Sequence, residues 1–253
     1  VLPAGLKQCP ARQAMIGAGI PSSTGAVTVN KACGSGMQAT IYAIDSIAAG
    51  TNQLVISGGL ESMSNAPQLL MTGRKGIRLG HGQTFDHMFL DGLEDAYTGG
   101  AMGGFAQPAA DAHALNREAM DQYAIASLER AKSATESGVL QGEITPVTIK
   151  TRRGEHIVEH DEQPLKGRPD KIPSLRPAFT KDGTITAANS SSISDGASAL
   201  LVASAAAVEA HNLQPMAKIV AHSRFSRPPE EFTLAPVGAI EKLLERTGWN
   251  AAD

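Results

Sequence analysis

Cysteines, aromatic residues and long apolar runs are scarce in this sequence. Only Cys9 and Cys33 occur among 253 residues, and aromatic residues make up 4% of the chain. Two cysteines are too few for a disulfide scaffold, and neither lies in a pattern with metal-ligand spacing, so we expect no metal site. No apolar run approaches the roughly 18 residues of a membrane span, and we therefore expect no membrane partner.

An excess of charge of one sign is also missing. The 22 basic and 25 acidic residues leave a formal net charge of −3. This balance argues against a broad nucleic-acid surface, although it leaves room for a local basic pocket that binds a phosphorylated ligand. Residues 1–5 lack the basic stretch and apolar core of a secretory signal, so we expect a reducing, cytoplasmic location.

The remaining composition is that of an ordinary globular protein. Hydrophobic residues make up 42% and charged residues 19%, and the chain is long enough to bury a sizeable core in one or two domains. Apolar periodicity and capping residues predict several helices. They are expected at residues 11–18, 37–50, 116–137, 204–211 and 236–247.

The segment 25–37 organises the prediction of the fold. Val27, Thr28 and Val29 predict a buried strand, and the small residues around Cys33 separate it from the next helix. A second short strand is expected at 54–57, ending at Gly58. Strand, helix and strand in about thirty residues predict a parallel βαβ unit, in which ligands collect at the carboxyl ends of the strands.

Cys33 is the candidate nucleophile. The first N–H groups of a helix are unpaired and form the positive end of its dipole, which favours a thiolate over a thiol. Gly34 and Gly36 leave space beside the sulfur for a bulky thioester. The residues alone leave a second interpretation open, in which Cys33 is a small buried side chain that packs like alanine.

Further along, the chain alternates between irregular and regular patterns. Residues 61–104 are rich in glycine and predict a long irregular segment, functional or disordered. Histidines 81, 87 and 113 have no metal-ligand spacing and are interpreted as solvated polar residues. Alternation predicts a hairpin at 145–159 and strands at 199–203 and 218–221.

Four motifs in register point to a known family. They are residues 30–36 (NKACGSG), 58–64 (GGLESMS), 176–179 (RPAF) and 189–197 (NSSSISDGA). Together they resemble the thiolases, in the acetyl-CoA acetyltransferase branch. The resemblance implies an α/β fold of αβαβα layers, incomplete here, with an inserted loop domain. The implied boundaries are 1–62 and 194–215 for the first half, 63–193 for the loop domain, and 216–253 for the start of the second half.

The resemblance also implies site residues. Cys33 matches the acyl-accepting nucleophile of the family, whose substrates are coenzyme A thioesters and which holds no tightly bound cofactor. The other matched residues line the path of coenzyme A. They are Ser191, Ala187, Phe179, Leu93 and Met102. The implied reaction condenses two acyl-CoA molecules to a 3-oxoacyl-CoA or runs in reverse as thiolysis. The implied oligomeric state is a homodimer or homotetramer.

The sequence departs from the family pattern in several places. It contains neither the Gly-His-Pro nor the Cys-x-Gly motif that supplies the activating histidine and the second cysteine, and it lacks the Asn-Glu-Ala-Phe segment. We therefore expect an internal fragment that is inactive alone. Ala101 stands where many biosynthetic members of the family have a histidine. Pro164 or Leu165 stands near a position where the family often has an arginine that contacts coenzyme A, and we expect Lys166 or Arg168 to compensate for its loss.

Two other functions remain as alternatives. A non-catalytic acyl-CoA or lipid carrier on the same fold would have no need of Cys33 between glycines. A ketoacyl synthase relative would place the nucleophile similarly but would use other loops than 61–64 and 189–197.

Overall fold

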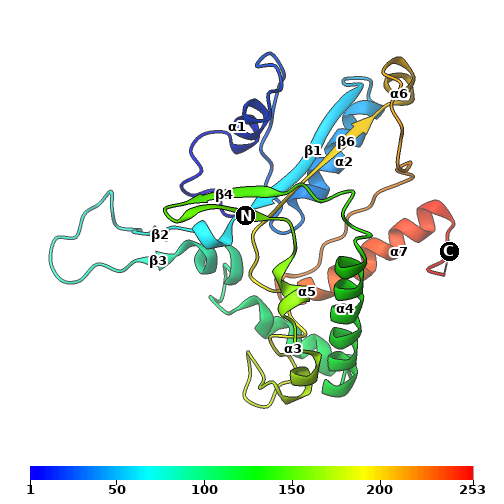
Figure 1. Ribbon diagram of the computed structural model, residues 1–253. Coiled ribbons are helices and arrows are strands. Elements are labelled where there is room, and N and C mark those ends of the chain that lie inside the picture. The colour runs from blue at the N-terminus through cyan, green and yellow to red at the C-terminus, as the bar shows by residue number, and fades with distance from the viewer. Residues whose placement is uncertain (253) are drawn as a thin grey trace. The chain divides into compact units, whose positions relative to one another are not determined.

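The structure is a computed structural model that describes residues 1–252 (Figure 1). The chain divides into two compact units. The first unit comprises Val1–Met102 and the chain from Ile193 onward, and the second unit comprises Gly103–Ser192. The domain boundaries implied by the family resemblance remain a prediction.

The helices of the first unit lie close to their predicted positions. They are α1 (Pro10–Gly17), α2 (Ser35–Ala48), α6 (Ala205–Ala210) and α7 (Ala235–Thr247). Pro236 lies in the first turn of α7, and Gly248 ends this helix with φ 71°, a left-handed conformation that glycine adopts without strain. The proline near the start of this segment and the glycine after its end therefore predicted both ends of α7.

The main sheet of the first unit is antiparallel. Strand β1 (Leu54–Glu61) pairs with β6 (Gly196–Ala203), with Leu54 opposite Ala203 and Glu61 opposite Gly196. The predicted parallel βαβ unit is therefore wrong. Residues 25–30 are irregular and Val27 is 80% exposed, because the partner of β1 comes from far along the chain and not from this apolar run. Residues 218–221, also predicted as a strand, are irregular.

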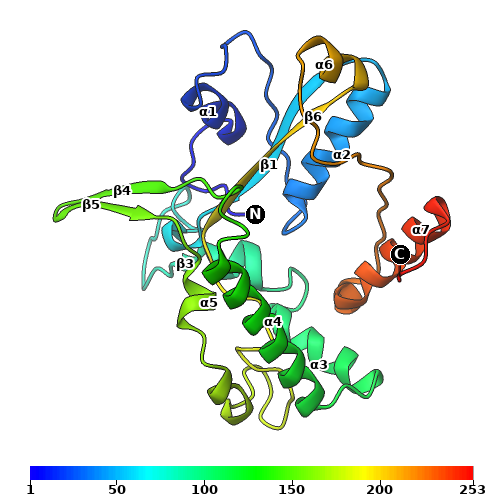
Figure 2. The same cartoon turned by 45° about the vertical axis from the view of Figure 1, so that its right-hand side comes forward.

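Strand β1 continues through the two glycines that were expected to end it. A Cβ atom at Gly58 would lie 2.0 Å from the carbonyl oxygen of Ser198, and one at Gly59 would lie 3.3 Å from the Cα of Gly36. Gly58 therefore permits pairing with β6, and Gly59 permits contact with α2, which lies along the β1–β6 pair in Figure 2.

The segment 61–104 forms short elements, where a long irregular stretch was predicted. They are the 3₁₀-helix η1 (Met63–Asn65), the antiparallel strands β2 (Gln68–Leu69) and β3 (Phe85–Asp86), and the π-helix η2 (Phe89–Leu93). His87 is buried, with Nδ1 2.6 Å from Asp91 Oδ2 and Nε2 accepting from Ala4 N at 3.2 Å. Its interpretation as a solvated residue is therefore wrong.

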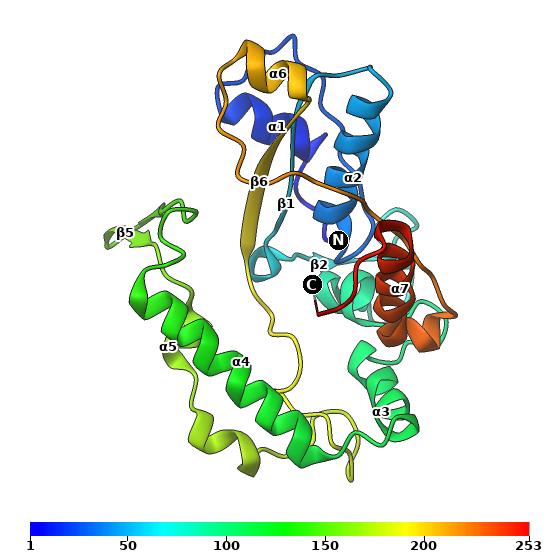
Figure 3. The same ribbon diagram turned by 90° about the vertical axis from the view of Figure 1, so that its right-hand side faces the viewer.

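The second unit is built on a long helix. Its elements are α3 (Met102–Ala112, which begins one residue before the unit), α4 (Arg117–Ser137), β4 (Val147–Thr151), β5 (Gly154–Val158), α5 (Glu162–Lys166) and the 3₁₀-helix η3 (Pro169–Ser174). Asn116 caps α4 by accepting from Ala119 N at 2.8 Å, and Gly138 ends it with φ 72°, as predicted. The predicted hairpin is β4–β5. Helix α4 packs on α5 and η3 (Figure 3).

Buried apolar side chains are few in both units. Ile41 and Ala43 on α2 form part of the core of the first unit, and Ile172 and Ile185 belong to that of the second. Large apolar side chains remain exposed on the main sheet, among them Ile56 and Leu201, which lie opposite each other. Among residues 1–252, no helix combines the length and apolar character needed to cross a bilayer.

The 3₁₀-helix η4 (Pro229–Leu234) leads directly into α7. Phe225, just upstream, packs on α7, since a Cβ atom at Gly238 would lie 2.7 Å from its ring.

Candidate active site

Cys33 lies on an exposed turn directly before α2. Gly34 is the N-cap of this helix, and the Cys33 side chain is open to solvent and forms no disulfide. The interpretation of Cys33 as a buried alanine-like residue is therefore wrong. The predicted position before a helix is confirmed, although irregular backbone and not a strand precedes it.

Short hydrogen bonds hold the Cys33 turn. Ser35 Oγ accepts from Lys31 N at 2.9 Å and donates to Ala32 O at 2.5 Å, while Asn30 Oδ1 accepts from Ala32 N at 2.9 Å. Within this hydrogen-bonded turn, the backbone of Ala32 has a left-handed conformation, with φ 46°. Sequence reasoning gave Asn30 and Ser35 no role, although asparagine and serine are typical of such side-chain-to-backbone turns.

The turn suits a nucleophile on three counts. It is exposed, it is held by local bonds, and it lies at the positive end of the α2 dipole, where negative charge is stabilised. Gly36, in the first turn of α2, lies against β1, where a Cβ atom would be 3.6 Å from Gly59 N. The helix start is thereby fixed to the sheet.

Leu93 and Met102 lie on the two arms of a tight hairpin. Leu93 ends η2 and Met102 begins α3, and the residues between them form an antiparallel bridge from Glu94 to Ala101. Asp95 closes the turn; the hydroxyl of Thr98 donates to its carboxylate at 2.8 Å and is the main cause that lowers the pKa of Asp95. The structure thus brings these two predicted residues together, with both side chains half-buried.

Phe179, Ala187 and Ser191 share one loop of the second unit, residues 176–191, here called the arch loop. All three residues are exposed. The backbone N–H of Ala178 donates to Ile185 O at 2.9 Å and joins the two arms of the arch loop. Its predicted residues therefore lie on one connected segment.

Internal hydrogen bonds stiffen the second half of the arch loop, residues 184–191, here called the return arm. Thr186 is 0% exposed, and its N–H donates to Asn189 Oδ1 at 2.7 Å. Asn189 Nδ2 donates to Thr184 O at 3.0 Å, and Ser190 Oγ donates to Thr186 O at 2.7 Å. These polar side chains fix the backbone of the return arm, which the sequence pattern alone did not show.

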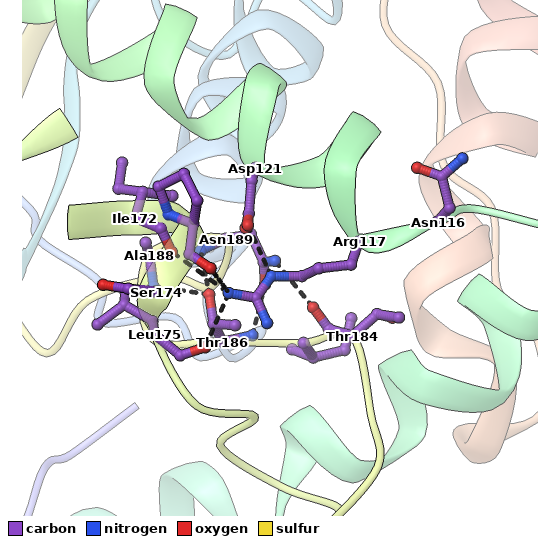
Figure 4. Close-up of polar contacts among 12 residues, drawn as sticks. Asn116, Arg117, Asp121, Ile172, Ser174, Leu175, Thr184, Thr186, Ala188 and Asn189 are labelled. Carbon is purple, nitrogen blue, oxygen red and sulfur yellow. Dashed lines mark hydrogen bonds and ion pairs between the residues drawn. The ribbon is translucent and has the colours of Figure 1, made fainter. Parts of the chain in front are cut away.

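Arg117 holds the chain just before the arch loop (Figure 4). Its Nε donates to Asp121 Oδ2 at 2.7 Å, and an η nitrogen donates to Leu175 O at 2.8 Å and to Ile172 O at 3.3 Å. Sequence reasoning missed Arg117; the only signal was the spacing of four residues between an arginine and an aspartate on one helix.

Two of the family-like motifs meet in the first unit. Glu61 pairs with Gly196 at the end of the main sheet, and Asp195 Oδ1 accepts from Ser64 N at 3.0 Å. This backbone hydrogen bond is the main cause that lowers the pKa of Asp195. Segments 58–64 and 189–197 are therefore joined in space.

The two basic residues expected to meet coenzyme A are both ion-paired. Lys166 Nζ lies 3.0 Å from Glu162 Oε2, and Arg168 donates to both carboxylate oxygens of Asp170 at 3.1 and 3.0 Å. Such exposed pairs contribute little to stability. In the described part of the chain, no cluster of three or more His, Cys, Asp or Glu side chains is placed to hold a metal ion.

Comparison with known proteins identifies the family. The family model described as "Thiolase, N-terminal domain" matches residues 1–206. The acetyl-CoA acetyltransferase of Schizosaccharomyces pombe is 42% identical over 254 residues, covering 100% of this chain and 64% of that protein. "Acetyl-CoA acetyltransferase ERG10, cytosolic" of Gibberella zeae is 43% identical over 253 residues, covering 99% of this chain and 64% of its own length.

Solved structures agree with the sequence matches. The crystal structure of Acat5 thiolase from Ascaris suum in complex with coenzyme A superposes with a TM-score of 0.91 at 39% identity, covering 100% of this chain and 64% of that one. The chain thus spans about 64% of the length of these relatives. The family model, the relatives and the shared α/β fold together show that this chain belongs to the thiolase family.

Proposed function

We propose that this chain is part of an acyl-CoA acyltransferase of the thiolase type, with Cys33 as the acyl-accepting nucleophile. The observation that carries the proposal is the exposed, hydrogen-bonded position of Cys33 before α2 in a thiolase-family chain. The relatives named acetyl-CoA acetyltransferase support the same activity. A non-catalytic carrier has no use for such a cysteine.

In the proposed reaction, the Cys33 thiolate attacks the thioester carbonyl of an acyl-CoA, and the coenzyme A thiolate leaves. The acyl group then rests on Cys33 as a thioester. A second acyl-CoA, deprotonated at its α-carbon, attacks this carbonyl, which forms a carbon–carbon bond and releases the Cys33 thiolate with a 3-oxoacyl-CoA. Thiolysis runs these steps in reverse. Sequence 1–253 contains neither the Gly-His-Pro nor the Cys-x-Gly motif, so the remaining acid and base are proposed to come from outside it.

Coenzyme A is proposed as substrate and not as a resident cofactor. Ser191, Ala187 and Phe179 of the arch loop are proposed to meet its pantetheine arm, and their exposure supports this role. Leu93 and Met102 are proposed to line the same path. The Ascaris suum relative was solved in complex with coenzyme A, which supports a coenzyme A site in this chain as well.

The proposal extends to organisation and location. Residues 63–193 are proposed to form the inserted loop domain; the second unit, Gly103–Ser192, falls inside this range. We propose a homodimer or homotetramer for the full-length protein and a cytoplasmic location, supported by the relative named cytosolic. The balanced charge supports the absence of a nucleic-acid partner.

The first prediction tests Cys33 against the other free cysteine. Acetyl-CoA is expected to acetylate the full-length protein once, at Cys33, because Gly34 and Gly36 leave space beside this exposed thiol for the thioester, whereas Cys9 has no neighbouring glycine. Mass spectrometry of the intact protein and its peptides measures this. Cys33→Ala should lose the acetyl adduct and the condensation activity. Cys9→Ala is the matched control, since Cys9 is also exposed and precedes a helix, and it should retain both.

The outcomes separate the alternatives. Condensation that survives Cys33→Ala overturns the proposed nucleophile. Coenzyme A binding without any acetylation of Cys33 identifies the carrier instead.

A further inference from the structure

The return arm of the arch loop is held by one buried side chain from another element. Gln107, on α3, is 9% exposed. Its Oε1 accepts from Thr184 N at 2.8 Å and from Ile185 N at 3.4 Å. Its Nε2 donates to Thr184 Oγ1 at 3.1 Å and to Asp111 Oδ1 at 2.8 Å. Both ends of the amide are thus used, and Asp111 fixes its orientation.

The arch loop approaches Gln107 closely at Gly183. A Cβ atom at Gly183 would lie 2.6 Å from Gln107 Oε1 and 2.1 Å from Thr180 Oγ1. One turn earlier on α3, a Cβ atom at Gly103 would lie 2.1 Å from the ring of Phe179. Residues four apart share one face of a helix. One face of α3 therefore receives Phe179 and the return arm together.

Hydrogen bonds connect residues 184–185 to the rest of the return arm. Thr184 O accepts from Asn189, which in turn accepts from Thr186 N. Ala187 follows Thr186, and Ser191 follows Ser190, whose hydroxyl donates to Thr186 O. The chain that leads into the arch loop has a separate anchor, because Arg117 donates to the carbonyls of Ile172 and Leu175 (Figure 4).

We propose that Gln107 is a positioning residue that holds the arch loop in the conformation that binds the pantetheine arm of an acyl-CoA. This inference rests on the proposed function. Loss of the amide frees the return arm, while Arg117 still holds the chain that leads into the arch loop, so the binding-competent conformation becomes a fraction of the population. Apparent affinity falls by that fraction. Chemistry at saturating substrate changes little, because the hydrogen bonds of the Cys33 turn lie within residues 30–35.

The test is Gln107→Leu in the full-length protein. We expect the KM for acyl-CoA to rise about tenfold, while kcat stays within about twofold of the parent. Amide exchange at Thr184 and Ile185 should become faster, and alkylation of Cys33 by iodoacetamide should keep its rate. Gln122→Leu, at an exposed position of α4, is the matched control and should change none of these.

Two further variants keep the test decisive if Gln107→Leu folds poorly. Gly183→Ala places a Cβ atom against both Thr180 Oγ1 and Gln107 Oε1, which should displace the loop from the same amide and raise KM in the same way. The double variant Gln107→Glu with Asp111→Asn exchanges acid and amide; the amide introduced at position 111 donates to the new carboxylate, and Thr184 can donate its hydroxyl. This pair should restore KM to within about threefold of the parent.

The two proposals fail in different ways. If the parent protein neither acetylates Cys33 nor turns over acyl-CoA, the proposed function fails. If the parent is active and both Gln107→Leu and Gly183→Ala leave KM unchanged, or lower kcat alone, the role of Gln107 is overturned.

Discussion

At the residue scale, Asp195 shows how a single side chain joins segments far apart in the sequence. Its carboxylate accepts from the backbone N–H of Ser64, 131 positions earlier, and this bond lowers the pKa of Asp195. Nothing in the motif 189–197 predicted this partner. Serine, asparagine and aspartate in such a loop are compatible with many backbone partners, and the tertiary structure selects one.

The pH dependence of Asp195 follows from the direction of its pKa. The folded state holds the pKa of this carboxyl below its ordinary value of 3.8, so the bond stabilises the protein above that pH. The stabilisation is lost as the pH falls through the lowered pKa. Asp195→Asn should reduce the free energy of unfolding at neutral pH by about 0.5–1 kcal/mol, a small value because the group is exposed.

Urea unfolding of the full-length protein at several pH values measures this effect. The difference between parent and Asp195→Asn should shrink toward zero below pH 3.8. Asp182→Asn, at another exposed loop aspartate, serves as the control. A difference that stays constant down to low pH would contradict the assignment to the ionised carboxylate.

At the scale of elements, helix ends were predictable and strands were less so. Asn116 and Gly138 mark the ends of α4, because a cap acts within one turn and needs no distant partner. The apolar run at 27–29 did not become a strand, because a strand requires a neighbour for its ladder. The neighbour of β1 is β6. The sequence predicted a strand at the position of β6 but did not predict that it pairs with β1.

Gly58 provides a prediction at this scale. Gly58→Ala puts a Cβ atom where Ser198 O lies and should separate β1 from β6, lowering the free energy of unfolding by about 1–3 kcal/mol. The matched control is Gly196→Ala in the paired strand, where a Cβ atom meets nothing within 4 Å. Urea unfolding compares the two. Equal stability of both variants would show that the close approach of the strands is not required.

At the scale of the whole molecule, the main sheet keeps apolar side chains on its surface. Ile56 is 55% and Leu201 53% exposed, and they face each other across the β1–β6 pair. Contiguous exposed apolar surface promotes association.

Residues 1–253 alone should therefore self-associate and bind a hydrophobic dye. Light scattering after size-exclusion chromatography and dye fluorescence measure both effects. Ile56→Glu with Leu201→Lys should reduce them, because opposite charges across the strand pair replace the apolar contact surface. The control Thr148→Glu with Ile157→Lys, at opposed positions of the exposed β4–β5 hairpin, should reduce them less. A soluble monomer with one sharp melting transition would contradict the prediction.

The sequence by itself determined the family, helices α1, α2, α4, α6 and α7, and the position of Cys33 before a helix, because these depend on local patterns and on motifs in fixed order; it did not predict α3 or α5. Only the tertiary structure decided the pairing of β1 with β6, the exposure of Cys33, and the burial of His87 and Gln107. These features depend on which distant backbone groups meet. Hydrogen bonds such as that from Thr184 N to Gln107 form between residues 77 positions apart, and no local pattern specifies them.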